Sequence, residues 1–202
     1  MRWLTTHPPE IDEVRQAIER IVKDANRAND VISRIHSLVR KAAPSKSAFN
    51  INEAILEVVA LIRAEALKQG VTTRTELADN LPRICGDRVQ LQQVMINLVI
   101  NAIQAMSGVE DVRELHISTE YDASEGVCVA VRDTGPGLCA EKLPDLFEPF
   151  YTTKPAGMGM GLSICRTIIA DHGGRLWASE HNAKGALFQF TIPATCAQPT
   201  ML

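Results

Sequence analysis

The sequence has few features of a disulfide-stabilised, zinc-binding or nucleic-acid-binding protein. Its five cysteines are scattered along 202 residues, and no two of them form a C-x-x-C pair. An odd, unpatterned set indicates reduced thiols, which argues against a disulfide framework or a structural zinc site, so we expect a cytoplasmic protein. The net charge of −3 at pH 7 gives no reason to expect nucleic acid as a partner.

One long uncharged stretch has to be tested as a membrane span. Residues 89–109 contain no charged side chain, but they include four glutamines, two asparagines and a serine. So many polar side chains would be costly in lipid, so we expect no membrane contact from this segment.

The first part of the chain predicts one long helix with a heptad seam. Its apolar residues recur in alternating steps of three and four, and this seam consists of Ile11, Val14, Ile18, Ile21, Ala25, Ala28, Ile32, Ile35 and Val39. A helix cannot bury such a seam alone. We expect residues 11–39 to pair in a helical hairpin or a homodimer; the alternative is that they dock on the chain's own globular domain.

The remainder of the chain predicts a separate α+β domain. A proline- and lysine-containing linker follows residue 41, so we place a helical region at 1–43 and a globular domain at 44–202. The expected order is β-α-β-α-β-β-loop-α-β-β, with Asn52 and Asp87 capping the first two helices. It predicts a two-layer sandwich with helices on one face of a mixed, mostly antiparallel sheet. The expected elements are 49–51, 53–68, 71–77, 87–106, 115–121, 127–132, 160–171, 175–179 and 186–192.

Two asparagines form the first of four polar segments. Asn97 and Asn101 are four residues apart, so they share one helix face. An amide oxygen suits a hard cation such as Mg²⁺, and an amide N–H can reach a phosphate. Taken alone, the pair is more typical of two buried amides that tie down a loop.

The second segment places Asp133 at a strand end, before a turn that contains Gly135 and Gly137. A carboxylate there can accept a hydrogen bond from an exocyclic amine, and glycines let a flat ring approach bare backbone. An ordinary D-x-G turn is the alternative.

The third and fourth segments carry features of a phosphate site. Lys154 follows an aromatic stretch and could neutralise phosphate charge, although a solvated surface lysine is the usual case. Gly157, Gly159 and Gly161 lead directly into a helix, where backbone N–H groups form an anion site. The pattern matches neither a Walker A loop nor a dinucleotide fingerprint. Neither a His–Cys metal cluster nor the spacing of a Ser-His-Asp triad is present.

In this order and at these separations, the four segments resemble the N, G1, F and G2 boxes of sensor histidine kinases. These kinases belong to the GHKL superfamily, which also includes gyrase, the Hsp90 chaperones and the mismatch-repair ATPases. The resemblance covers about residues 49–193 and implies a Bergerat-type ATP-binding fold. The heptad helix looks like the second helix of the dimerisation and phosphotransfer hairpin. The stretches "LFEPFYTTKP" and "GMGMGLSI" look most like soluble, PAS-linked kinases of the oxygen-sensing type.

The resemblance also implies roles for individual residues. Asn101 would hold the Mg²⁺ that bridges the ATP phosphates, with Asn97 beside it. Asn97 stands where gyrase-type ATPases have a glutamate, and an amide cannot act as that base, which fits transfer to a protein rather than hydrolysis. Asp133 would accept from the adenine amine. The remaining implied contacts are Gly135 and Gly137 at the base, Lys154, Gly157, Gly159, Gly161 and Leu162 at the phosphates, and Thr191 at adenine through water.

None of the five histidines fits the family's phosphate acceptor, which an acidic residue follows directly and a proline follows five residues later. His36 is followed by Ser37 and flanks the seam. The resemblance therefore implies a fragment that lacks the first hairpin helix beyond Arg2-Trp3-Leu4. We expect it to bind ATP and Mg²⁺ without autophosphorylating, and to serve a response regulator. The alternatives are an ATP-hydrolysing relative and a non-catalytic docking module.

Overall fold

The computed structural model describes residues 11–17, 46–152, 159–180 and 184–194. Residues 11–17 are helical, as the heptad pattern predicts, and belong to a unit separate from the globular domain. The rest of the seam, residues 18–39, lies outside the described residues, as do Lys154 and Gly157.

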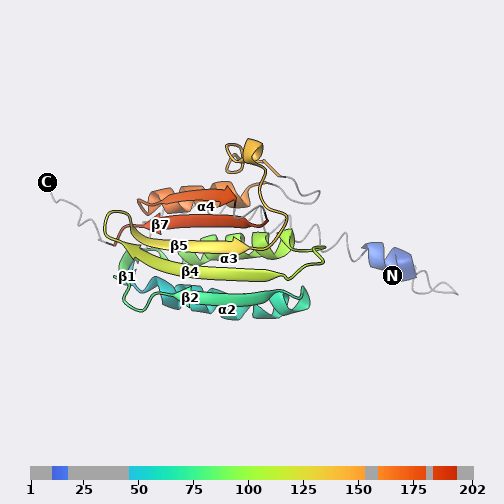
Figure 1. Ribbon diagram of the computed structural model, residues 1–202, viewed down its shortest axis with the longest axis horizontal. Helices are drawn as coiled ribbons and strands as arrows, with labels where there is room; N and C mark the ends of the chain where they lie inside the picture. Colours follow the sequence, from blue (N-terminus) through green and yellow to red (C-terminus); the bar gives the residue numbers. More distant parts are fainter. Residues whose placement is uncertain (1–10, 18–45, 153–158, 181–183, 195–202) are drawn as a thin grey trace. The chain divides into compact units, whose positions relative to one another are not determined.

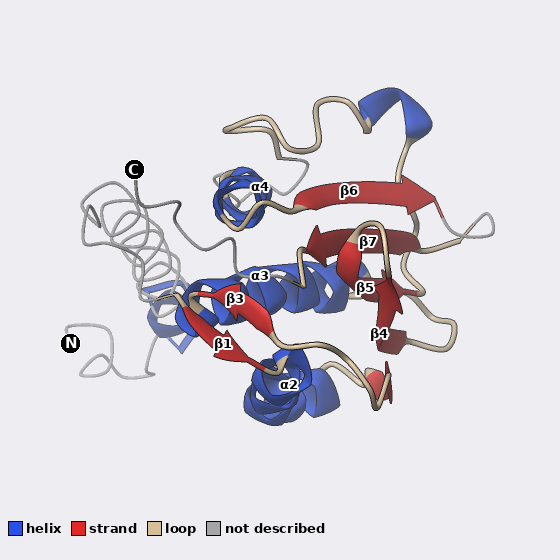
Figure 2. Cartoon of the chain, turned by 90° about the vertical axis from the view of Figure 1, so that its left-hand side faces the viewer, coloured by secondary structure: helices blue, strands red, loops and turns tan. Residues whose placement is uncertain are grey.

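The globular domain is a two-layer α+β sandwich, which confirms the predicted fold class (Figure 1). Its main sheet has the order β2-β4-β5-β7-β6, in which β2 is parallel to β4 and all other pairs are antiparallel. The three long helices lie along one face of this sheet (Figure 2). The elements are β1 (Ser47–Phe49), α2 (Ile51–Lys68), β2 (Thr72–Leu77), β3 (Ile84–Gly86), α3 (Arg88–Ala105), β4 (Glu114–Asp122), β5 (Gly126–Asp133), a short 3-10 helix (Ala140–Lys142), α4 (Gly161–Asp171), β6 (Arg175–Glu180) and β7 (Ala186–Ile192).

A small second sheet joins the starts of α2 and α3. Strand β1 pairs antiparallel with β3, and Phe49 lies opposite Ile84. Strand β3 is not predicted from the sequence, because three residues are too few to show an alternating pattern. The predicted first strand lies two residues too late, since Ile51 is already the first residue of α2.

The helix caps agree with the sequence in one case and differ in the other. Asp87 caps α3 as predicted, and its Oδ1 accepts from the backbone N–H groups of Val89 (3.0 Å) and Gln90 (3.2 Å). The prediction that Asn52 caps α2 is wrong. Asn50 is the N-cap, and Asn52 instead donates to the carbonyl oxygen of Ala78 at 2.9 Å.

The core lies between the helices and one face of the sheet, with α3 at its centre. Leu91, Met95 and Leu98 of α3 are fully buried, as are Ile117 of β4 and Phe190 of β7. In β5 the buried valines at positions 127, 129 and 131 alternate with residues of the opposite face. Among the described residues, no helix is long and apolar enough to cross a membrane.

Candidate functional site

Helix α3 carries the two asparagines of the first segment, and Asn97 faces α4. Both asparagine side chains are half-buried. The Nδ2 group of Asn97 donates to Sγ of Cys165 on α4, at 3.6 Å. Cys165 is fully buried, so this contact joins the asparagine face of α3 to the first turns of α4.

Asp133 ends β5 and is almost completely buried, with 3% of its surface exposed. Its Oδ1 accepts hydrogen bonds from the backbone N–H groups of Gly135 (2.8 Å) and Ala186 (3.2 Å). Burial raises the pKa of this carboxyl above its usual value of 3.8, although the two backbone N–H groups oppose the shift. Oδ2 takes part in neither hydrogen bond and is therefore the atom that can accept from a ligand.

The turn after β5 packs against the end of α3 and the start of β7. A Cβ at Gly135 would lie 2.9 Å from Asp133 Oδ1 and 3.4 Å from the carbonyl carbon of Ala105. Gly137 has a φ of +89°, and a Cβ there would lie 3.3 Å from the carbonyl oxygen of Gly185. Ala105 comes one turn of α3 after Asn101, so the first two polar segments meet at this end of the helix.

The backbone of Phe150 contacts that of Gly159, two residues before the start of α4. The N–H of Phe150 donates to the carbonyl oxygen of Gly159 at 2.9 Å. Both residues have positive φ, 70° and 65°, and a Cβ on Gly159 would overlap the backbone of Phe150 and Tyr151. Only glycine fits this close approach at position 159.

The start of α4 is not capped by the side chain of its N-cap residue, Met160. Gly161 is the first residue of the helix, and a Cβ there would meet no atom of the described residues within 4 Å. Leu162 is half-buried and packs on the core. Backbone N–H groups and the positive end of the helix dipole make a helix N-terminus suitable for a phosphate.

Thr191 lies away from Asp133, the residue with which it was predicted to bind adenine. It lies opposite Cys128, five residues before Asp133 along β5. Its Oγ1 accepts from the N–H of Arg175 at 3.4 Å. Its neighbours Phe190 and Ile192 are fully buried in the core, so Thr191 points to the opposite face of the sheet.

Gly185 and Ala186 are the residues that the sequence analysis missed. Ala186 supplies the second N–H to Asp133, and Gly185 has a φ of +91°. A Cβ at Gly185 would overlap the carbonyl oxygen of Asp133. Gly185, directly before β7, could have suggested a close backbone approach. Only the pairing of β5 with β7 shows that the approach is to Asp133.

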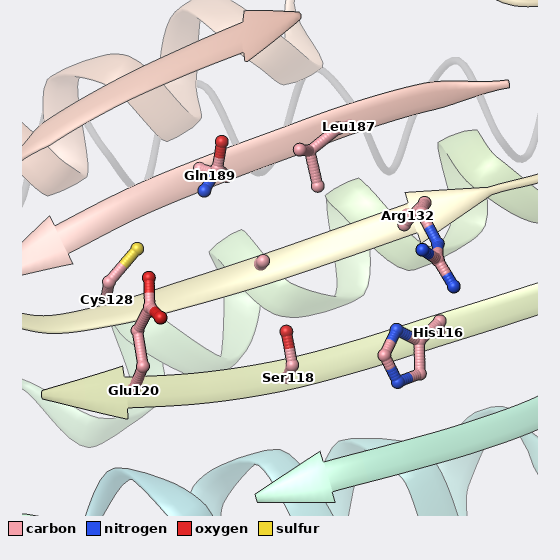
Figure 3. A pocket seen from close by; sticks show the side chains of 8 residues that line it. His116, Ser118, Glu120, Cys128, Arg132, Leu187 and Gln189 are labelled. Atoms are coloured by element: carbon pink, nitrogen blue, oxygen red, sulfur yellow. The ribbon is translucent and has the colours of Figure 1, made fainter. Parts of the chain in front are cut away.

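A separate hollow lies on the sheet face that the helices do not cover (Figure 3). Strands β4, β5 and β7 line it, through His116, Ser118, Glu120, Cys128, Ala130, Arg132, Leu187 and Gln189. Burial, followed by the charge of Glu120, raises the pKa of the Cys128 thiol to about 11. A mixed polar lining is typical of the solvated face of an antiparallel sheet, and Asp133 lies on the other face. We therefore place the candidate site on the helix side.

The site is suited to a nucleotide rather than to a protein-bound metal cluster. Among the described residues, no group of three or more His, Cys, Asp and Glu side chains could hold a metal ion. The turn after Asp133 packs on the end of α3, and Asn97 of the same helix contacts α4. These elements offer a carboxylate for an amine, amides for a phosphate-bound cation and a helix terminus for phosphate.

Known proteins with similar sequences are sensor histidine kinases. The chain is 40% identical over 186 residues to the sensor protein FixL of Bradyrhizobium diazoefficiens, covering 92% of the chain and 37% of FixL. It is 38% identical over 196 residues to the sensor histidine kinase TmoS of Ectopseudomonas mendocina, covering 96% of the chain and 20% of TmoS. The chain thus spans between a fifth and two fifths of the length of these relatives.

Solved structures give the same result. The catalytic domain of histidine kinase ThkA is 39% identical, with a TM-score of 0.67 over 75% of this chain and 97% of that domain. A structure of ThkA in complex with the response regulator protein TrrA gives a TM-score of 0.76 at 32% identity, over 96% of this chain and 55% of that one. The model of the histidine kinase-, DNA gyrase B- and HSP90-like ATPases matches residues 86–195, and the chain belongs to this family.

Proposed function

We propose that the chain is the ATP-binding catalytic region of a sensor histidine kinase. In this proposal, ATP with Mg²⁺ binds between α3, the turn after β5 and the start of α4, and its γ-phosphoryl group passes to a histidine for relay to an aspartate of a response regulator. The proposal depends most on the hydrogen bonds of Asp133. Two backbone N–H groups donate to its Oδ1, so Oδ2 remains to accept from the adenine amine.

The other site residues fit positions along the nucleotide. Asn101 would supply its amide oxygen to Mg²⁺, with Asn97 beside it, and the N-terminus of α4 would receive phosphate oxygens. Mg²⁺ would neutralise the charge on the phosphates, while the protein positions them. Lys154 and Gly157 remain predicted phosphate contacts, since they lie outside the described residues.

Transfer to a histidine is favoured over hydrolysis because position 97 carries an amide. Asn97 cannot remove a proton from an attacking water molecule, so a general base for hydrolysis is missing there. In the proposed transfer, an imidazole nitrogen forms a bond to the γ-phosphorus while the bond to the bridging oxygen of ADP breaks. The proton on the other ring nitrogen then leaves to solvent.

The two described histidines are poor phosphate acceptors. His172 is buried, and its ring nitrogens contact the carbonyl oxygen of Ile168 (2.7 Å) and the backbone N–H of Asp87 (2.9 Å). His116 lies within β4, with Nε2 3.3 Å from Glu76 Oε1. His7, His36 and His181 lie outside the described residues and lack the acceptor pattern. We propose that the accepting histidine is not among these five, so this chain alone does not autophosphorylate.

The wider assignment follows the relatives. ThkA has been solved with the response regulator TrrA, which supports a receiver domain as partner. The chain is similar both to FixL and to TmoS, so the soluble, PAS-linked, oxygen-sensing type stays a prediction from the sequence and no signal is assigned. We propose that residues 1–43 form the dimerising helical region and 44–202 the catalytic domain, within a cytoplasmic portion of the kinase.

Calorimetry with ADP and with a non-hydrolysable ATP analogue tests the proposal. We expect micromolar affinity, typical of nucleotide sites of this kind, and weaker binding when Mg²⁺ is removed. Absence of nucleotide binding would overturn the proposal. A second test mixes the chain with a heterodimerising partner kinase that carries the acceptor histidine but cannot bind ATP. We expect transfer of label from ATP to that histidine, and no transfer despite confirmed pairing would count against a kinase.

A further inference from the structure

The buried thiol of Cys165 is placed to control the orientation of the Asn97 side chain. Cys165 lies on α4, one turn after Gly161, and none of its surface is exposed. Its Sγ accepts from Nδ2 of Asn97 at 3.6 Å, a normal separation for a hydrogen bond to sulfur. The two residues are 68 positions apart in the sequence, so this contact exists only because α3 and α4 pack together.

The surroundings of the thiol determine which end of the amide it can bind. Sγ also lies 4.0 Å from the carbonyl oxygen of Val94, which can receive the S–H proton. A thiol that donates to Val94 presents its lone pairs to Asn97, and lone pairs require the NH₂ end of the carboxamide. Burial raises the pKa of Cys165 to about 12, so the group stays a neutral thiol at physiological pH.

The orientation has a consequence for the other end of the amide. The oxygen and nitrogen of a carboxamide lie on opposite sides of its carbon, so Oδ1 of Asn97 faces away from Cys165. Asn101 lies one turn further along the same face of α3. Two amides on this face can therefore offer oxygen toward a cation, which is the atom that Mg²⁺ accepts as a ligand.

We propose that Cys165 is a positioning residue: it fixes the Asn97 carboxamide with Nδ2 inward and Oδ1 toward the Mg²⁺ and phosphates of a bound nucleotide. The role toward Mg²⁺ and phosphates rests on the proposed function, whereas the orientation of the Asn97 carboxamide is a property of the chain without ligand. The alternative is that Cys165 only fills space between α3 and α4. In that case a variant with another small side chain at position 165 would leave the Asn97 amide unchanged, apart from any effect of lower stability.

Two substitutions separate these possibilities. Cys165→Ala removes the acceptor, while Cys165→Ser restores a group that can both accept from Asn97 and donate to Val94. Cys128→Ala is the matched control, because it removes another buried thiol from the opposite face of the sheet. Each variant is made in the full chain, and its folding is checked by thermal unfolding.

The first measurement needs no nucleotide. In spectra of the ¹⁵N-labelled chain, the Asn97 side-chain amide is identified by its loss in Asn97→Asp. We expect this signal to move in Cys165→Ala toward the position of a solvated amide, to return most of the way in Cys165→Ser, and to stay unchanged in Cys128→Ala. An unchanged Asn97 signal in a folded Cys165→Ala chain would overturn the proposal.

The second measurement compares ADP affinity with Mg²⁺ and with a chelator. We expect Cys165→Ala to lower the Mg²⁺-dependent part of the affinity about three- to tenfold, the range for one lost hydrogen bond, with Cys165→Ser near wild type. Equal loss with and without Mg²⁺ would indicate a packing role and contradict the proposal. If the wild-type chain binds no ADP, the proposed function fails, whereas the amide spectra still report whether Cys165 holds Asn97.

Discussion

The backbone N–H of Asp87 donates a hydrogen bond to Nε2 of His172, across 85 positions of sequence and at a distance of 2.9 Å. The other ring nitrogen, Nδ1, contacts the carbonyl oxygen of Ile168 at 2.7 Å, which makes it the protonated nitrogen of a neutral imidazole. The ring therefore joins the end of α4 to the N-cap of α3. Both helices carry candidate site residues, so this buried contact helps to maintain their relative position.

Replacing this ring should destabilise the domain. We expect His172→Ala to lower the free energy of unfolding by about 2–3 kcal/mol, because it leaves a cavity and an unpaired N–H at Asp87. Urea unfolding measures the change. His116→Ala is the control, since that half-buried histidine lies on the sheet face away from the helices and should cost less. Equal losses in the two variants would show that the His172 contacts contribute little.

Gly159 and Gly161 are two residues apart but should respond oppositely to alanine. Gly159→Ala puts a Cβ into the backbone of Phe150 at a φ of +65°, so we expect a loss of about 1–3 kcal/mol. In Gly161→Ala the new Cβ lies in a helix and meets no atom of the described residues within 4 Å, so we expect stability to be unchanged or raised by up to about 1 kcal/mol. Thermal unfolding of both variants checks this, and the same sign in both would contradict it.

Gly161→Ala should nevertheless weaken nucleotide binding. The open space in front of Gly161 lies at the start of α4, where we propose that phosphate oxygens bind. A methyl group there takes part of that space, so we expect ADP affinity to fall while stability does not. Calorimetry on the Gly161→Ala chain, with Cys128→Ala as a control, measures this. Wild-type affinity in Gly161→Ala would argue against phosphate binding at this terminus.

The elements that the sequence predicts are those with local signals. Asp87 caps α3 by accepting from the N–H groups of residues directly after it. The apolar periodicity of the long helices can likewise be recognised from residues close together in the sequence. Contacts between distant strands were missed. Strand β3 exists because it pairs with β1, and Ala186 reaches Asp133 through a backbone N–H that any residue type could supply. Thr191 has the expected residue type, but the register of β5 with β7 places it away from Asp133.

The same reasoning explains why Cys165 could not be identified from the sequence. Its spacing within α4 is that of an ordinary core position, and it is buried like Ile168 and Ile169. Only the packing of α4 against α3 brings its sulfur to Asn97. A sequence thus shows residue types that suit a chemical role, whereas the side chains that contact them depend on tertiary packing.

Asp133→Asn should stabilise the fold, although it removes the proposed hydrogen-bond acceptor for the adenine amine. The amide oxygen can still accept from the N–H groups of Gly135 and Ala186, but the side chain no longer ionises. Burial raises the pKa of Asp133 in the folded chain, so its contribution to stability is present below pH 3.8 and is lost as the pH rises through the folded pKa. We therefore expect Asp133→Asn and wild type to be similarly stable below pH 3.8 and the variant to be the more stable above the folded pKa.

Nucleotide binding should change in the opposite direction. In Asp133→Asn an NH₂ group replaces the Oδ2 acceptor and faces the adenine amine, which is itself a donor. The loss of a hydrogen bond to a charged acceptor predicts ATP affinity at least about tenfold weaker at neutral pH. Urea unfolding between pH 3 and 8 and calorimetry at pH 7 provide the two measurements. Retained ATP affinity in Asp133→Asn would remove the central support for adenine recognition at this site, whatever the unfolding data show.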